Sequence, residues 1–124
     1  MQRKFTVPFH IPGTLSADLD IRFIVPSDCQ LVHVSAVASN DSAALLTIGD
    51  SADTDEYLTS TEIGDSQAPA EFDGDNFVDS DGNSHTRYYP HITDGTIVVI
   101  TLDYDGDSSV AADDFTIVLT FVEG

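Results

Sequence analysis

Alternating apolar and polar residues dominate the last quarter of the sequence. The run at 114–123 (DFTIVLTFVE) places large apolar side chains on one face and mostly threonine and valine on the other. A period of two in residues that favour extended structure predicts a β-strand. The preceding run, 96–104 (TIVVITLDY), is apolar on both faces at its start. We therefore expect protein on both of its sides, either inside a two-sheet sandwich or at a contact between subunits.

The first residues predict another strand, with a proline inside it. Apolar side chains alternate through this segment, but Pro8 has no backbone N–H, which confines the strand to a sheet edge or to an arm. We predict that residues 1–12 form an N-terminal edge strand or arm and that residues 13–124 form a single β-sandwich domain. An arm of this kind can join a neighbouring chain by strand addition. The candidate partner-binding residues here are Arg3, Lys4, Phe5, Val7 and Phe9.

Further strands are predicted through the rest of the chain. The runs at 19–25, 29–39 and 44–49 are separated by turn-forming residues and read as a meander. Bulky residues are sparser from 50 to 94, where short strands near 70–72 and 87–89 and at most one helical turn are expected. The total of about seven to nine short strands is typical of an antiparallel β-sandwich or jelly roll.

The charge of the chain restricts its partners. Four Lys and Arg residues stand against 22 Asp and Glu residues, giving a formal net charge of -18. A surface of this sign repels nucleic-acid backbones and anionic membranes, so we expect neither as a partner. The same carboxylates suit a solvated surface in salty surroundings. No apolar run is long enough to span a membrane, and synthesis in a cytoplasm is expected.

Two isolated side chains are interpreted as structural. Cys29 is the single cysteine, and its place beside an apolar run indicates a small core residue rather than a nucleophile. His33 falls on the same predicted face as Leu31 and Val37, where a packed, hydrogen-bonded histidine is expected.

Clusters of aspartate raise the question of a metal site. Asp103, Asp105, Asp107 and Asp114 have spacings that resemble an oxygen-ligand calcium loop. Ser108 stands where such loops need glycine, and strands rather than helices flank the segment. A second cluster lacks a matching terminal ligand and comprises Asp73, Asp75, Asp79, Asp81 and Asn83. Solvated loops are the preferred interpretation of both clusters, and no cofactor is expected.

No catalytic motif is found, but one local group of side chains is suited to binding. Arg87, Tyr88 and Tyr89, with His85 and His91 nearby, combine apolar area with hydrogen-bonding groups that favour protein contacts. The alternative is that the two tyrosines close one end of the sandwich. We expect no enzymatic activity and assign no catalytic residue.

The strand-forming segments resemble a family of viral proteins. The segments 21–26 (IRFIVP), 30–40 (QLVHVSAVASN), 95–106 and 114–124 are similar to small β-sandwich proteins encoded beside the major capsid protein of tailed bacteriophages. Those resemble the cement, or decoration, proteins of the head. The resemblance implies a jelly-roll subunit without an active site that forms a homotrimer. It would bind the major capsid protein on the outside of the virion, after synthesis in the host cytoplasm.

A second function stays open on sequence grounds. The same sandwich can serve as a binding module for carbohydrate or for a calcium-dependent ligand. Such a module is expected to display an exposed aromatic platform, and the chain contains no tryptophan.

Overall fold

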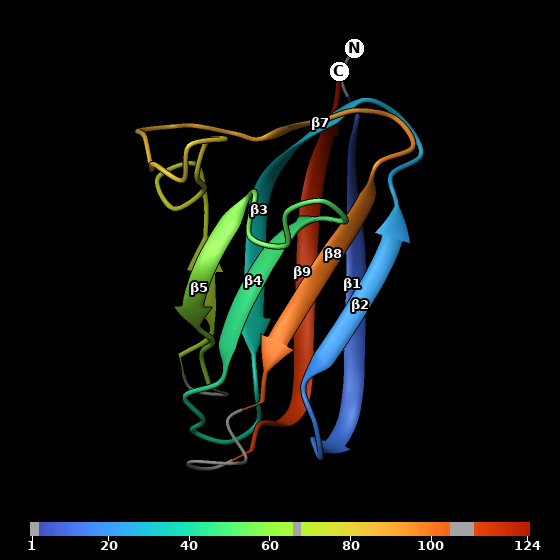
Figure 1. Ribbon diagram of the computed structural model, residues 1–124. Helices are drawn as coiled ribbons and strands as arrows, with labels where there is room; N and C mark the ends of the chain where they lie inside the picture. The colour runs from blue at the N-terminus through green and yellow to red at the C-terminus, as the bar shows by residue number, and fades with distance from the viewer. Residues whose placement is uncertain (1–2, 66–67, 105–110) are drawn as a thin grey trace.

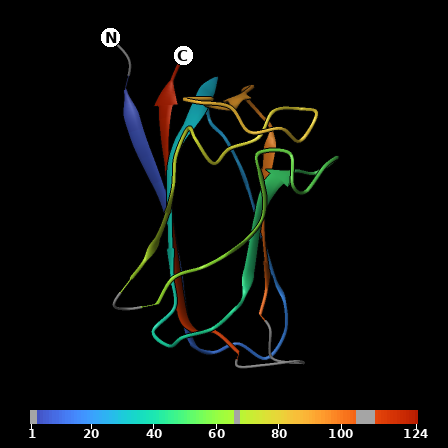
Figure 2. The same ribbon diagram turned by 90° about the vertical axis from the view of Figure 1, so that its left-hand side faces the viewer.

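Two antiparallel sheets packed face to face make up the fold (Figures 1 and 2). The structure is a computed structural model and describes residues 3–65, 68–104 and 111–124. Within these residues every regular element is a strand. The strands are β1 (Lys4–Thr14), β2 (Leu19–Ile24), β3 (Cys29–Val37), β4 (Leu45–Asp50), β5 (Leu58–Glu62), β6 (Ala70–Phe72), β7 (His91–Ile92), β8 (Ile97–Asp103) and β9 (Asp113–Glu123).

The order of the strands is that of a jelly roll. One sheet has the order β1-β9-β3-β6, with β7 also paired to β3, and the other has the order β2-β8-β4-β5. The pairs are nested: β1 pairs with β9, β2 with β8, β3 with β6 and β7, and β4 with β5. This is the arrangement of one long hairpin wrapped into two layers. The predicted all-β sandwich of jelly-roll type is confirmed.

The alternation seen in the sequence places the core between the sheets. In β9, Phe115, Ile117, Leu119 and Phe121 are fully buried, while the intervening residues are only partly covered. They face side chains from the opposite sheet, including Ile100 of β8. The strand predicted at 114–123 is therefore confirmed, with its apolar face turned inward.

The β4–β5 connection of the same chain covers part of the second apolar face of β8. Val99 points away from the core but is fully buried. Beside it, Gly49 lies against the following loop, because a Cβ atom at this position would come within 2.2 Å of the Asp53 carbonyl oxygen. Figure 2 shows the loop projecting from the outer side of the sheet. The burial of Val99 therefore needs no second subunit.

Three predictions of local structure are wrong. The runs at 19–25, 29–39 and 44–49 do not form a meander, because β2 and β4 lie in one sheet and β3 lies in the other. Residues 87–89 do not form a strand, because Arg87 adopts a positive φ of 57°, which breaks an extended backbone; the strand lies at His91–Ile92 instead. His33 does not share a face with Leu31, because an irregularity between them shifts the register against β9. His33 is on the outer face, where its Nε2 lies 3.1 Å from Oε1 of Glu71.

β1 lies at the edge of its sheet and pairs with β9 along most of its length. The Arg3 carbonyl accepts a hydrogen bond from the N–H of Glu123, so odd-numbered residues of β1 bond to β9 and even-numbered residues point their backbone groups outward. Pro8 belongs to the outward set. It removes a donor from the open edge without weakening the ladder inside the sheet.

Candidate interaction surfaces

The calcium-loop candidates do not come together in one described cluster. Asp103 ends β8 in one sheet, Asp114 stands in β9 of the other sheet, and Asp105 and Asp107 lie outside the described residues. The Asp114 carboxylate accepts hydrogen bonds from the Gly13 N–H at 2.7 Å and the Ser39 hydroxyl at 2.9 Å. These bonds hold the pKa of Asp114 below its usual range. Asp114 thus fastens the end of β1 and the loop after β3 to the start of β9.

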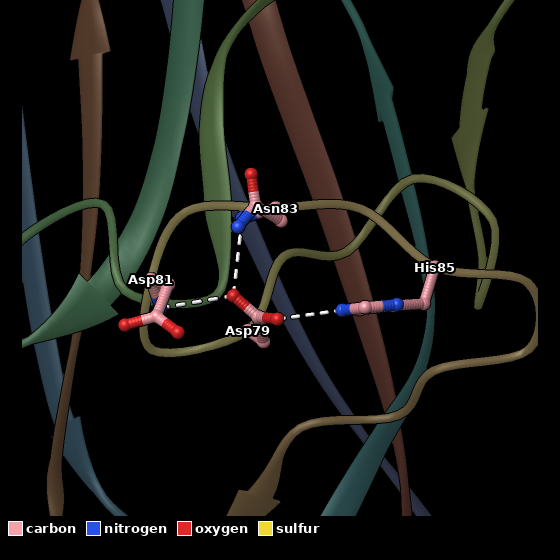
Figure 3. A network of polar contacts seen from close by, with 4 residues as sticks. All are labelled: Asp79, Asp81, Asn83 and His85. Atoms are coloured by element: carbon pink, nitrogen blue, oxygen red, sulfur yellow. Dashed lines mark hydrogen bonds and ion pairs between the residues drawn. The ribbon is translucent and has the colours of Figure 1, made fainter.

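The second aspartate cluster is occupied with capping its own turns. Figure 3 shows Asp79 at the centre of one such network. Its Oδ1 accepts the backbone N–H groups of Asp81 and Asn83 at 2.9 and 3.1 Å, and its Oδ2 lies 2.6 Å from Nε2 of His85. The contact with His85, followed by the backbone bonds, lowers the pKa of Asp79. The Asp79 carboxylate therefore has a role in the structure of its own turn.

Asp73 and Asp75 make similar local bonds. The Asp73 Oδ1 accepts the backbone N–H of Asp75 at 3.0 Å, and the Asp75 Oδ1 accepts the backbone N–H of Arg87 at 3.1 Å. The second bond spans the loop and fixes the turn at Arg87. In the part of the chain that the structure describes, no three His, Cys, Asp or Glu side chains are grouped so that they could hold a metal ion.

Cys29 has the environment of a core residue. Its side chain is fully buried, and burial, followed by the nearby Asp28 and Glu123 carboxylates, raises its pKa to about 11. A thiol with so high a pKa is a poor nucleophile at neutral pH. The interpretation of Cys29 as a small core residue is confirmed.

The group at 87–89 is divided between surface and core. Tyr88 is partly buried against the core, and its ring centroid lies 5.9 Å from that of His85. Arg87 and Tyr89 are exposed, Tyr89 at 37%. The structure therefore brings His85 and Tyr88 together, leaves Arg87 and Tyr89 accessible, and places His91 in β7. Tyr88 partly fulfils the alternative role of closing the sandwich.

The N-terminal candidate partner-binding residues lie along the edge of the sandwich that β1 forms. Phe5, Val7 and Phe9 are half-buried with their side chains toward the core, whereas Arg3 and Lys4 are exposed. The ring of Phe5 stacks on Phe121 at 5.1 Å, and the ring of Phe9 lies 5.7 Å from Phe23 of β2. These contacts place the edge strands β1 and β2 on the same side of the molecule, at the right of Figure 1.

An apolar patch that the sequence pattern did not predict lies next to these edges. Ile24 is 63% exposed and its cross-strand neighbour Ile97 is 38% exposed. With Arg22 and Phe23 they line a shallow hollow of about 240 Å³. The sequence signal for the patch is Ile24. It follows Asp20 and Arg22 at every second position of the same strand, so it faces outward with them.

Charge is distributed unevenly between this side and the rest of the chain. Residues 1–27 contain Arg3, Lys4 and Arg22, three of the four basic residues, but only two acids, Asp18 and Asp20. Arg87 and the other 20 acids belong to the remainder of the chain. The segment that forms β1 and β2 is therefore the least acidic part of the chain, and the one that repels an acidic surface least.

Comparison with known proteins agrees on the class of fold. No protein-family model and no curated protein matches the sequence. Among solved structures, a chain of the cyanophage Pam1 capsid asymmetric unit is similar, with a TM-score of 0.52 and 13% sequence identity. The match covers 99% of this chain and 85% of that chain, so the two are of similar length. At this identity, the likeness establishes a shared fold.

The described residues contain no helix with the length and apolar composition that a transmembrane helix requires.

Proposed function

We propose that this chain is a non-enzymatic structural protein of a tailed bacteriophage, which decorates the outside of the head and stabilises it by binding the major capsid protein lattice. The observation that carries the proposal is the jelly-roll fold, shared over nearly the whole chain with a capsid component of similar length. It would be made in the host cytoplasm and act as a homotrimer on the virion surface.

The distribution of charge supports a docking role for the β1–β2 side. Arg3 and Lys4 are exposed at the start of β1, next to an edge that carries half-buried aromatic side chains. Side chains of this kind match a lattice surface with acidic and apolar patches, whereas the acidic remainder favours solvent. Arg87, Tyr88 and Tyr89 form a second candidate contact, on the connection between β6 and β7.

Binding to capsids tests the proposal. Purified protein is mixed with heads from which decoration has been stripped, and bound protein is measured by sedimentation across a concentration series. We expect saturable binding that weakens as salt is raised. Exposed charges around the contact attract the lattice, and dissolved ions screen that attraction. Absence of saturable binding to the cognate heads would overturn the proposal.

Two charge reversals locate the contact. Lys4→Glu and Arg87→Glu change the net charge equally but lie on the two different candidate surfaces. We expect Lys4→Glu to weaken binding and Arg87→Glu to weaken it less, with circular dichroism confirming that both remain folded. The opposite order would move the contact from the β1–β2 side to the β6–β7 connection.

A further inference from the structure

The outer edge of β2 has backbone groups available for another strand. The Val25 N–H donates to the Thr96 carbonyl, so odd-numbered residues in this stretch face β8. By the alternation of an antiparallel ladder, Asp20, Arg22 and Ile24 turn their N–H and C=O groups away from β8. In the described part of the chain β2 ends its sheet, and no strand covers this edge. Unlike the edge of β1, it contains no proline.

The side chains of β2 form a pattern that is complementary to itself. On the outer face, Arg22 Nε lies 3.0 Å from Oδ1 of Asp20, and both side chains are about half exposed. On the inner face, Leu19, Ile21 and Phe23 are only partly buried. Read in either direction from Ile21, the strand presents one charged residue and then one large apolar residue, and the two charges are opposite.

We propose that a second copy of this chain pairs with β2, antiparallel and about a two-fold axis at Ile21. In this register Asp20 of each copy faces Arg22 of the other, Leu19 faces Phe23, and Ile21 faces Ile21. Asp20 and Arg22 belong to the outward-pointing set, so each of these two pairs exchanges backbone hydrogen bonds. The four charged side chains alternate in sign around the axis, and the apolar pairs cover the half-exposed inner stripe.

The charges select this register over its neighbours. Because only outward-pointing residues can exchange ladder bonds, the permitted registers differ by steps of two residues. One neighbouring register sets Asp20 against Asp20, and the other sets Arg22 against Arg22, and like charges facing each other are destabilising. The β2 side also belongs to the least acidic part of a chain of charge -18, where two copies can approach with least repulsion.

This contact goes beyond the proposed function and does not depend on it. A two-fold contact joins two single chains, or two trimers if the chain forms trimers. Mass in solution is therefore expected to rise with concentration, from one chain to two for single chains, and from three chains to six or more for trimers, which carry three β2 edges each.

Charge exchange tests the contact. The mass of the wild-type protein is measured by sedimentation equilibrium from micromolar to millimolar concentration in physiological salt. Asp20→Arg and Arg22→Asp are measured singly and together, and Glu62→Arg on β5, the opposite edge of the same sheet, is the matched control for net charge. Circular dichroism reports folding for each variant.

We expect the wild-type mass to double and each single variant to weaken the dissociation constant by about tenfold or more, because both cross-strand pairs become repulsive. The double exchange restores the alternating charges and should restore doubling. Asp20→Arg and Glu62→Arg both lower the net negative charge. If general repulsion alone governed association, both variants would associate more strongly than the wild type. Failure of the wild type to double, wild-type behaviour of both single variants, or no rescue by the double exchange would overturn the proposal.

Discussion

The stacking of Phe5 on Phe121 decides whether β1 belongs to its own sandwich or reaches a neighbour. Phe121 is fully buried, and its ring lies 5.1 Å from Phe5 with an interplanar angle of 18°. Phe121→Ala should cost about 3–5 kcal/mol of unfolding free energy, as expected for a phenylalanine removed from a core. Phe5 is half-buried, so Phe5→Ala should cost about 1.5 kcal/mol.

A double-mutant cycle isolates the contact. Unfolding in urea of the wild type, both single variants and the double variant should give a coupling energy of about 0.5–1.5 kcal/mol. Phe9→Ala is the matched control, because its ring contact is with Phe23 rather than Phe121. The Phe5–Phe121 coupling should not change with protein concentration. No coupling, or coupling that appears only at high concentration, would refute β1 as an edge strand of its own chain and favour the arm.

Four further predictions concern salt, protons and the thiol. Melting temperature should rise with ionic strength equally in NaCl and KCl, through screening of the net charge of -18, and calcium should give no saturable rise beyond magnesium at equal ionic strength. The lowered pKa of Asp114 means that its ionised form contributes stability above the ordinary value of about 3.9, and this contribution is lost as pH falls through the lowered folded pKa. Asp114→Asn should therefore destabilise the protein at pH 7 but not at pH 2. The hydrogen bond to Asp53, followed by burial, raises the pKa of Asp55, so Asp55→Asn should instead stabilise it at pH 7 in thermal unfolding. Cys29, with a pKa of about 11, should react with a thiol reagent at pH 8 about a hundredfold more slowly than in the unfolded chain, and equal rates would contradict its burial.

Strand periodicity carried most of the fold prediction. Alternation in β9 and the position of Pro8 follow from backbone sterics and burial, which the sequence expresses directly. The class of fold could therefore be predicted from residues alone. The features that were predicted wrongly depend on single backbone angles and on single inserted residues. Arg87 occupies a turn with positive φ, and the bulge near His33 changes the face of every residue after it.

The surfaces were harder to predict than the strands. Ile24 is exposed and Val99 buried, although both are apolar residues on the outer side of the same sheet. The difference arises because the β4–β5 connection folds over Gly49 and covers only its own part of the sheet. Likewise, Asp79 and Asp114 are explained by backbone N–H groups that the sequence alone does not place beside them. Contacts distant in sequence decide these roles.

Imaging of reconstituted heads tests the capsid assignment most directly. Cognate heads stripped of decoration are incubated with the protein and reconstructed by electron cryomicroscopy, beside stripped heads without it. We predict added density on the outer surface, at three-fold positions of the lattice, into which three copies of the jelly roll fit. Reconstructions that are identical with and without the protein, or added density confined to the inside of the shell, would contradict the account.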